Sequence, residues 1–305
     1  MKTFKFLKYL FLILFSFSIL SFSCENNGKD DDDLLETQPP GSTDPEQNPS
    51  NTDTNQKKLV KMNIKSSYDY ERQYTYNYDN NETLVSINES WSGSKPGEET
   101  YILEWGRDGI AIKIDEEYDM FYQLSNKKVN KIEYAYSESY YNIEYDTNGY
   151  LNKIIYNPSS GNYVNDTEWT WWNDKLIKIV TKGISDYSAN TTTNTFTYSS
   201  QKCEGFNPII SCYCIEEIMC AIPRMAGCSQ QYLPNEMRQE EISIYANEES
   251  TTTYKSYVNS NFKYTFYDDG YLKTCTVAKS GRSESEIDGV IEFDYGDEVY
   301  EFIWQ

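Results

Sequence analysis

A strand–turn–strand pattern recurs along most of this chain and constrains its fold more than any other feature. Each copy has an aromatic-rich segment, a turn that begins with a polar residue, and a second segment with two apolar residues three positions apart. The clearest copy is 143–154, I-E-Y-D-T-N-G-Y-L-N-K-I. Recognisable copies begin at Tyr74, Tyr101, Phe121, Tyr141, Trp169 and Phe262. Their spacing of roughly 20–27 residues indicates a fold built from repeated hairpins.

The residue types in each copy explain why it should form a hairpin. Alternating aromatic residues, such as Tyr74 and Tyr76, share one face of a strand. Asp146 can hydrogen-bond to the backbone that follows it, and Gly149 can adopt the positive φ that a tight turn needs. In one copy the loop shortens to Asn173-Asp174, which suffices for a two-residue hairpin because both residue types tolerate positive φ.

The apolar pairs in the second segments pose a question of geometry. The pairs are Leu84/Ile87, Val129/Ile132, Leu151/Ile154 and Leu176/Ile179. In a flat strand, residues three positions apart point to opposite faces. Either a bulge lies between the two residues of each pair, or both faces of the sheet are partly covered.

The composition supports strands, because the chain has 29 Tyr, 13 Phe and 6 Trp and aromatic residues favour a pleated, half-buried surface. We therefore predict an all-β fold for residues 59–305: an antiparallel meander of about 12–14 strands built from repeated hairpins. The sheet should be strongly curved or closed into a barrel, since closure hides the edges of a tyrosine-rich sheet.

A cysteine-rich insertion at 203–240 interrupts the repeat, and the run 209–222 within it could hold one short helix. Apart from Cys24, the cysteines are Cys203, Cys212, Cys214, Cys220, Cys228 and Cys275. An even number in an exported protein favours disulfide bonds, with fifteen possible pairings. The alternatives are free or mixed thiols and a thiolate metal site, and the absence of paired C-x-x-C motifs argues against a metal. Cys275 occupies the apolar position of its copy, which favours a place in the core.

The first 23 residues have the features of a secretory signal peptide. Three lysines precede an apolar run at 9–20, which is shorter than the roughly 20 residues that a spanning helix needs. The segment that ends at Cys24 resembles a bacterial lipobox of the relaxed kind found in Bacteroidota lipoproteins, with Ser21 where an aliphatic residue is usual. The resemblance implies that the Cys24 thiol is acylated and anchors the chain in outer-membrane lipid.

Residues 24–58 read as a flexible tether that carries four prolines among polar and acidic residues. Its acidic run is Asp30, Asp31, Asp32 and Asp33. This run resembles the surface-export signal of the same bacterial group, which implies an outward-facing protein. The alternative is a solvated spacer, as most charge runs are.

Charge and composition exclude several functions. The chain has no histidine, which excludes Ser-His-Asp and Cys-His nucleophiles and imidazole zinc sites. The net charge is −21, and removal of a signal peptide with three of the 27 basic residues would make it −24. A field of this sign repels phosphate backbones, so we expect no nucleic-acid partner. Nothing in the sequence predicts a cofactor.

Trp169, Trp171 and Trp172 form the densest aromatic patch and are the candidate ligand platform, because exposed rings can stack on sugars. The alternative is that they pack across strands in the core. No catalytic residue is assigned, since the sequence places no two carboxylates at the separation that glycoside hydrolysis needs.

The hairpin copies resemble the YD-repeat, or Rhs-like, pattern of bacterial surface proteins. The region 59–300 more closely resembles the DUF4595 family of Bacteroidota lipoproteins, described as having a porin-like β fold. This resemblance implies an architecture and a cellular address and supplies no catalytic residue.

We expect a lipid-anchored cell-surface protein that is not an enzyme and binds a glycan or a protein partner. The alternatives are a carboxylate-dependent glycan hydrolase and a structural scaffold of the envelope. A membrane-spanning barrel is not expected, because the strands carry Lys, Asn and Glu and show no continuous lipid-facing band.

Overall fold

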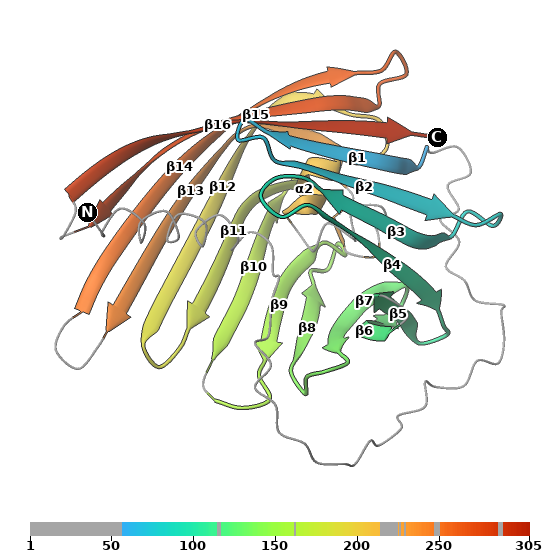
Figure 1. The fold of residues 1–305 in the computed structure, drawn as a ribbon, viewed down its shortest axis with the longest axis horizontal. Helices are drawn as coiled ribbons and strands as arrows, with labels where there is room; N and C mark the ends of the chain where they lie inside the picture. The colour runs from blue at the N-terminus through green and yellow to red at the C-terminus, as the bar shows by residue number, and fades with distance from the viewer. Residues whose placement is uncertain are drawn as a thin grey trace. The chain divides into compact units, whose positions relative to one another are not determined.

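The computed structural model describes residues 57–114, 117–161, 163–213, 225, 227–228, 230–246, 251–285 and 289–305. Its strands form one antiparallel meander that closes into a barrel, because β16 pairs with β1 (Figure 1). The strands are β1 (Leu59–Ser66), β2 (Glu71–Tyr78), β3 (Leu84–Trp91), β4 (Gly97–Trp105), β5 (Gly109–Ile114), β6 (Glu117–Ser125), β7 (Lys128–Tyr134), β8 (Tyr140–Tyr145), β9 (Leu151–Asn157), β10 (Val164–Trp172), β11 (Lys175–Ile184), β12 (Ser188–Lys202), β13 (Tyr232–Ala246), β14 (Thr251–Phe266), β15 (Leu272–Ser285) and β16 (Gly289–Trp304).

The predicted all-β, antiparallel meander is confirmed, and it is closed. The barrel has 16 strands, more than the predicted 12–14. The six recognisable copies of the repeat account for twelve of them. The other four are β1, β12, β13 and β16, which no turn of the repeat joins into a hairpin. In the described part of the chain, no helix has the length and apolar character needed to cross a membrane.

The turns have the chemistry that the sequence predicts. The Asp146 carboxylate accepts hydrogen bonds from the backbone N–H groups of Asn148 and Tyr150, both at 2.9 Å. Gly149 has a φ of +83°. Asn173 and Asp174 have φ values of +49° and +60°, as a two-residue hairpin turn requires.

A β-bulge lies inside the apolar pair of each of five copies, which answers the question that the sequence left open. The register skips one residue in the second strand of each of these hairpins: Val85, Asn130, Asn152, Ile177 and Lys273. The extra residue turns the two apolar residues to the same face. Leu84 and Ile87 are therefore both buried, with exposed fractions of 1% and 0%.

An aromatic residue near the end of one strand donates a hydrogen bond to a carbonyl beside a bulge in another strand. The pairs are Tyr78 to Leu59 (2.9 Å), Trp105 to Leu84 (2.6 Å), Tyr145 to Val129 (2.5 Å), Trp171 to Leu151 (2.6 Å), Tyr198 to Leu176 (2.7 Å) and Trp304 to Leu272 (2.7 Å). A bulge interrupts the ladder, so these half-buried carbonyls need a donor from outside it. We call these bonds the aromatic latches. Each latch residue is Tyr or Trp, which carries a donor, whereas Leu124 and Phe266 occupy the equivalent position in two other hairpins.

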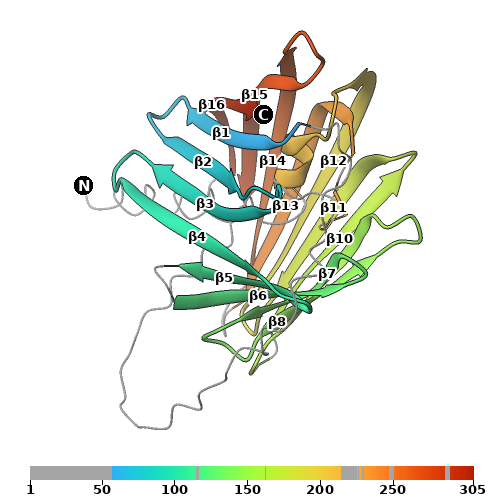
Figure 2. The ribbon, with the colours of Figure 1, turned by 90° about the vertical axis from the view of Figure 1, so that its right-hand side faces the viewer.

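The segment between β12 and β13 packs inside one end of the barrel. It includes the short helix α2 (Pro208–Cys212), which Asn207 caps through its side chain. Ile209 and Ile210 of this helix belong to the same core as apolar residues of the barrel wall. The helix lies within the ring of strands in two perpendicular views (Figures 1 and 2). The predicted short helix is thus present, and the insertion ends before β13 begins at Tyr232, earlier than the predicted residue 240.

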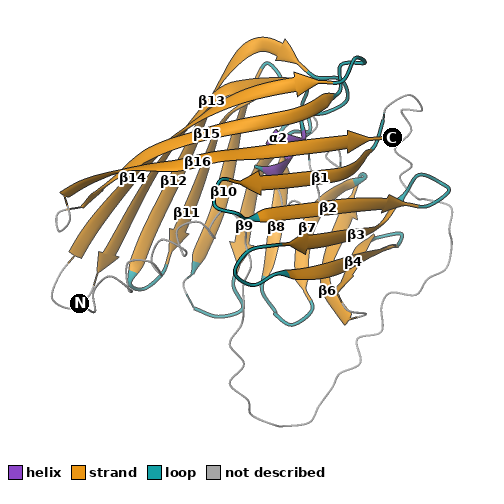
Figure 3. Cartoon of the chain, turned by 45° about the horizontal axis from the view of Figure 1, so that its top comes forward, coloured by secondary structure: helices purple, strands orange, loops and turns teal. Residues whose placement is uncertain are grey.

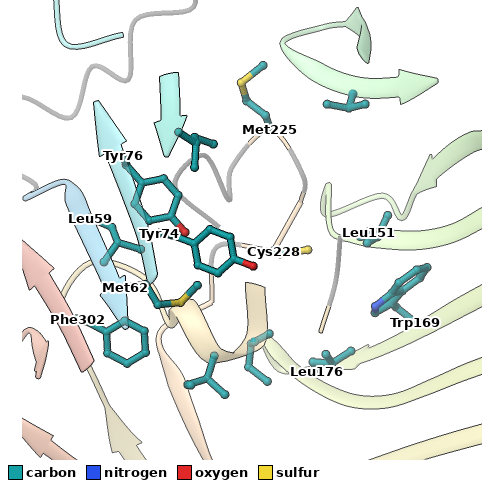
Figure 4. Packing of buried hydrophobic residues seen from close by; sticks show 14 of the residues in the cluster. Leu59, Met62, Tyr74, Tyr76, Leu151, Trp169, Leu176, Met225, Cys228 and Phe302 are labelled. Carbon is teal, nitrogen blue, oxygen red and sulfur yellow. The ribbon is translucent and has the colours of Figure 1, made fainter. Parts of the chain in front are cut away.

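The same segment binds the backbone of three successive bulged strands. The bonds run from Val129 N–H to the Met225 carbonyl (3.1 Å), from Leu151 N–H to the Gly227 carbonyl (3.1 Å), and from Leu176 N–H to the side chain of Gln230 (3.0 Å). Met225 and Cys228 lie between opposite walls, with Tyr74 and Met62 on one side and Leu151 and Trp169 on the other (Figure 4). We call the described part of this segment, residues 203–213, 225, 227–228 and 230–231, the plug.

The strands differ in length around the barrel. β1 to β11 have 6–10 residues, whereas β12 to β16 have 14–16 (Figure 3). The core residues of these longer strands lie toward the end that carries the repeat turns, as Phe196, Phe262 and Phe302 show. At the opposite end, the wall formed by β12 to β16 therefore extends beyond the apolar core.

Candidate functional site

The inner face of β10 to β14 is polar beyond the core. Inner residues alternate along a strand, so the positions two and four residues from the core residues Ile179, Phe196 and Met237 also point inward. They carry hydroxyl, amide and carboxylate groups. We call the following residues the polar inner face: Thr167, Thr181, Asn190, Thr192, Glu241, Ser243 and Ser256.

The polar inner face forms a hydrogen-bonded network. The Asn190 amide donates to the Glu241 carboxylate at 2.7 Å and to the Ser243 hydroxyl at 3.0 Å. The Thr192 hydroxyl donates to the Asn190 side-chain carbonyl at 3.3 Å. These residues are directly paired on adjacent strands, Thr192 with Glu241 and Asn190 with Ser243. The bonds hold the side chains in fixed orientations, which favours directional binding of a polar ligand.

Next to the polar inner face, four tyrosines from three strands and a loop touch in series. We call Tyr134, Tyr141, Tyr156 and Tyr163 the tyrosine ladder. The ring centroids of Tyr134 and Tyr141 are 6.1 Å apart, those of Tyr141 and Tyr156 are 4.9 Å apart, and those of Tyr156 and Tyr163 are 5.6 Å apart. Tyr134, Tyr156 and Tyr163 are half-buried, so part of each ring remains accessible. Burial raises the pKa of the Tyr163 hydroxyl, which keeps it protonated.

A second polar group on the inner face is built around two opposed carboxylates on β3 and β4. Glu89 and Glu99 are direct register partners. The Tyr101 hydroxyl lies 3.1 Å from Glu89 Oε2 and 2.5 Å from Glu99 Oε2. Arg72 Nε lies 3.2 Å from Glu89 Oε1. Burial is the main cause that raises the pKa of Glu89, the Glu99 charge adds to it, and Arg72 and Tyr101 oppose it.

Two polar atoms on the inner face have no hydrogen-bond partner, although they are buried. They are Asn194 Oδ1 and Ser260 Oγ, and Ser260 is wholly buried. Ser260 pairs across the sheet with Lys279, whose ammonium group lies 2.6 Å from the Glu298 carboxylate. Buried polar atoms are normally bonded. These two therefore mark a place where a water molecule or a ligand group completes the network.

The outer face of the barrel carries ion pairs and charged side chains, together with exposed apolar residues such as Ile102, Ile184 and Ile244. Lys113 on β5 pairs with Glu104 on β4 at 2.6 Å, and Lys153 on β9 pairs with Glu168 on β10 at 3.3 Å. The Arg282 guanidinium lies 4.8 Å from the Tyr257 ring on the same face. A lysine or arginine on the lipid face of a barrel costs about 2–4 kcal/mol at the bilayer midplane. The ion pairs on this outer face would carry such a cost within a bilayer.

The predicted Trp platform is not formed by its three residues together. Trp169 is 5% exposed and packs in the core, with its indole N–H 3.4 Å from the Tyr213 carbonyl. Trp171 is half-buried and serves as an aromatic latch, with its ring stacked on Tyr150 at 4.6 Å. Trp172 is 64% exposed. Because side chains alternate between the two faces of β10, Trp172 lies on the opposite face from Trp169 and Trp171. Trp169 and Trp171 therefore pack with the core and do not form a platform with Trp172.

The disulfide prediction finds no support in the described cysteines. Cys203, Cys212, Cys228 and Cys275 are not joined to one another. Cys203 and Cys275 are buried, and burial raises the pKa of both thiols, that of Cys203 to about 12. Cys275 thus belongs to the core, as its position in the repeat predicts. Cys214 and Cys220 lie outside the described residues, as do Cys24 and the acidic run Asp30, Asp31, Asp32 and Asp33.

Sequence reasoning missed the polar inner face because its strands are polar on both faces. In β12, Thr191, Thr193 and Thr195 face outward while Thr192 and Asn194 face inward. In a run of threonine and asparagine, no apolar side chains indicate which face of the strand points into the barrel. A change from polar to apolar residues at alternate positions of one strand could have revealed this face. In β12, the alternate positions before Phe196 are polar, whereas Phe196 itself is apolar.

Fold and site together define a closed 16-strand barrel that is plugged at one end, polar inside at the other, and charged outside. Two solved structures share this fold. A porin-like protein from Bacteroides uniformis superposes with a TM-score of 0.54 at 17% identity, covering 81% of this chain and 98% of that one. A porin-like protein from Bacteroides vulgatus superposes with a TM-score of 0.51 at 11% identity, covering 82% and 99%.

No protein-family model and no curated protein matches this chain. The structural neighbours agree with the porin-like β fold that the sequence resemblance implies, and at these identities they establish the fold alone. Membership of the DUF4595 family and the YD-repeat assignment stay predictions.

Proposed function

We propose that this chain is a lipid-anchored protein of a bacterial outer membrane, displayed on the cell exterior, that is not an enzyme and binds a glycan or a protein partner. The observation that carries the proposal is the charged outer face. Ion pairs such as Lys113–Glu104 and Lys153–Glu168 lie on strands that a spanning barrel would expose to lipid. A barrel that stands in water beside a membrane needs a separate anchor, and acylated Cys24 would supply it.

The packed core argues against a pore. A barrel of 16–18 strands can enclose an aqueous channel. Here core residues from opposite walls and the helix residues Ile209 and Ile210 form one cluster across the interior. The plug is bonded to the alternate strands β7, β9 and β11 through Val129, Leu151 and Leu176. A binding role on a barrel closed at one end fits this interior better than conduction does.

The place where the chain enters the barrel favours an outward-facing polar end. The Lys58 backbone pairs with that of Gln305, and Leu59 begins β1 within the core at the plugged end. An anchor at Cys24 would be joined to the barrel at this plugged end, and the polar inner face lies at the opposite end.

One observation favours the glycan hydrolase as a second candidate. Glu89 and Glu99 face each other across β3 and β4, and burial raises the pKa of Glu89, as a general acid requires. Retaining glycosidases place two carboxyl groups about 5–5.5 Å apart. Here, however, both carboxylates contact one tyrosine hydroxyl and Glu89 also pairs with Arg72. These contacts fit a structural network, so binding without turnover remains the proposal.

Membrane fractionation of the full chain tests the anchor. The wild-type chain should partition with outer membranes and incorporate labelled palmitate, and protease added to whole cells should remove it. Cys24→Ala should lose the label and leave the membrane pellet after a carbonate wash, while Cys203→Ala serves as a matched cysteine control. A Cys24→Ala chain that stays in the washed membranes would contradict the proposal and indicate an integral barrel. Sugar products released by the purified chain would establish the hydrolase instead.

A further inference from the structure

We propose that the polar inner face and the tyrosine ladder form one binding site for a neutral, hydroxyl-rich ligand, an uncharged oligosaccharide. This inference rests on the proposed function and deepens it, because it assigns the place and the chemical class of the ligand. The two surfaces are adjacent on the same side of the sheet. Tyr156 of β9 bonds through its backbone N–H to Asp166 of β10, one residue before Thr167.

Several charged groups on the inner face have partners within the protein. Glu89 pairs with Arg72, and Glu298 pairs with Lys279. The Glu241 carboxylate accepts hydrogen bonds from Asn190. In the described part of the chain, no three Cys, Asp or Glu side chains are grouped to hold a metal ion. The acidic groups on this face would repel an anionic ligand.

The groups that remain for a ligand are hydroxyls, amides and ring faces. Asn194 Oδ1 and Ser260 Oγ are buried without a partner on the same face. They lie in β12 and β14 between the apolar core and the polar inner face, so they are placed to bond to a group that reaches the base of the site. Asn194 offers an acceptor, and the Ser260 hydroxyl can donate or accept. A sugar carries hydroxyls that match both.

The tyrosine ladder supplies the apolar contact that a sugar ring needs. A sugar has C–H groups on its faces and hydroxyls around its rim, and a tyrosine presents a flat apolar ring with a polar tip. Tyr156 and Tyr163 meet edge to face at 79°, so the site offers ring faces in two orientations. Polar side chains on β10 to β13 then stand beside these rings. Stacking and directional hydrogen bonds occur side by side, as sugar recognition requires.

The small side chains of the polar inner face leave room for such a ligand. A 16-strand barrel is wide enough for an aqueous interior when side chains do not fill it. Large core residues and the plug fill it at one end. On β10 to β14, by contrast, many inner positions hold Thr, Ser or Asn, and Gly183 lies opposite Asn190. Larger side chains on the same face are Gln239, Glu241 and Val258, and the rings of Tyr245 and Tyr254 contact each other at 5.8 Å. The ligand would thus enter from the end away from the plug and stop at the core.

Binding measurements on the purified full chain test the site, with short neutral oligosaccharides of glucose, mannose, galactose and xylose as probes. Matched uronic-acid oligosaccharides and a lysine-rich peptide are the charged comparisons. At least one neutral probe should bind, and the charged probes should not. Preferential binding of a charged probe, or no neutral binding at millimolar concentration, would overturn the proposal. The proposed anchor would survive either result, because the fractionation of Cys24→Ala tests it separately.

Two pairs of matched variants locate the site. Thr192→Val removes an inner hydroxyl, and Thr193→Val makes the same change on the outer face of β12. Tyr163→Ala removes a ring of the ladder, and Tyr187→Ala removes an exposed ring elsewhere. We expect Thr192→Val and Tyr163→Ala to weaken neutral-sugar binding about tenfold, which corresponds to one hydrogen bond or stacking contact, and their controls to change it less than about twofold. Equal effects within each pair, or a loss of binding on Trp172→Ala alone, would place the ligand on another surface and overturn the assignment. Unchanged melting curves show that each variant is folded.

Discussion

The two ends of this barrel share one wall and differ in what they do with its inner face. At the plugged end, five of the six hairpin copies turn two apolar residues inward across a bulge, and aromatic latches bond to carbonyls beside the bulges. At the open end, the same strands present threonine, asparagine, serine and tyrosine. At the plugged end, the apolar core and the described residues of the plug fill the interior. The open end carries polar side chains, and the buried atoms Asn194 Oδ1 and Ser260 Oγ lie without a partner at its base.

The largest expected effect comes from the core. Leu176→Ala should lower the free energy of unfolding by about 2–5 kcal/mol, because Leu176 is wholly buried and its removal leaves a cavity beneath the plug. Urea unfolding followed by tryptophan fluorescence measures it. The matched control is Ile184→Ala on the same strand, where the side chain is 46% exposed. Equal destabilisation by the two variants would show that the two ends of β11 are not different in packing.

An aromatic latch should contribute less than a core residue. Tyr78→Phe removes the hydroxyl that donates to the Leu59 carbonyl at 2.9 Å. The half-buried carbonyl then loses its donor, and the free energy of unfolding should fall by about 1–3 kcal/mol. Tyr118→Phe is the control, since its hydroxyl bonds to Glu104 on the exposed outer face. If Tyr78→Phe unfolds at the same urea concentration as the wild type, the latches do not stabilise the bulges.

The carboxylate pair on the inner face should give the smallest effect and a specific pH dependence. Because the pKa of Glu89 is raised in the folded state, its contribution favours folding most at low pH and decreases as the pH rises through the folded-state pKa. Glu99→Gln removes a like charge directly opposite and lowers the pKa of Glu89. The variant should gain about 0.5–1 kcal/mol at pH 7.

The comparison of two pH values separates this effect from a simple change in packing. At pH 4, near the ordinary value of a glutamic acid, Glu99→Gln and the wild type should have nearly equal free energies of unfolding. A gain of the same size at both pH values would mean that Glu89 is not the group responsible.

The recurring hairpin pattern made the fold predictable. The role of the aromatic residue before each turn was not predictable from the pattern alone. The aromatic before each turn indicated a strand, and three tryptophans within four residues suggested a sugar platform. Trp171 instead donates to the Leu151 carbonyl, a contact that depends on the register of a neighbouring hairpin. The apolar pairs three positions apart indicated either a bulge or a sheet covered on both faces. Only the cross-strand register distinguishes these two alternatives.

The inner site was not predictable for a different reason. Thr192 and Thr193 are adjacent and chemically identical, and only barrel closure places one inside and the other outside. The contacts of the plug were not predictable either, because they depend on the three-dimensional fold. The cysteine-rich segment was visible as a break in the repeat, yet its bonds to Val129, Leu151 and Leu176 join residues that are far apart in the sequence.

The central claim is that the outer face of this barrel stands in water while an acylated Cys24 holds it to the membrane. A spin label at Thr193→Cys, on the outer face of β12, tests this most directly in the lipid-anchored full chain bound to vesicles, with the parent chain labelled in parallel as the background. We predict that a water-soluble nickel chelate relaxes the label more strongly than oxygen does. Relaxation dominated by oxygen, as in hydrocarbon, would contradict the account and place the barrel within the bilayer.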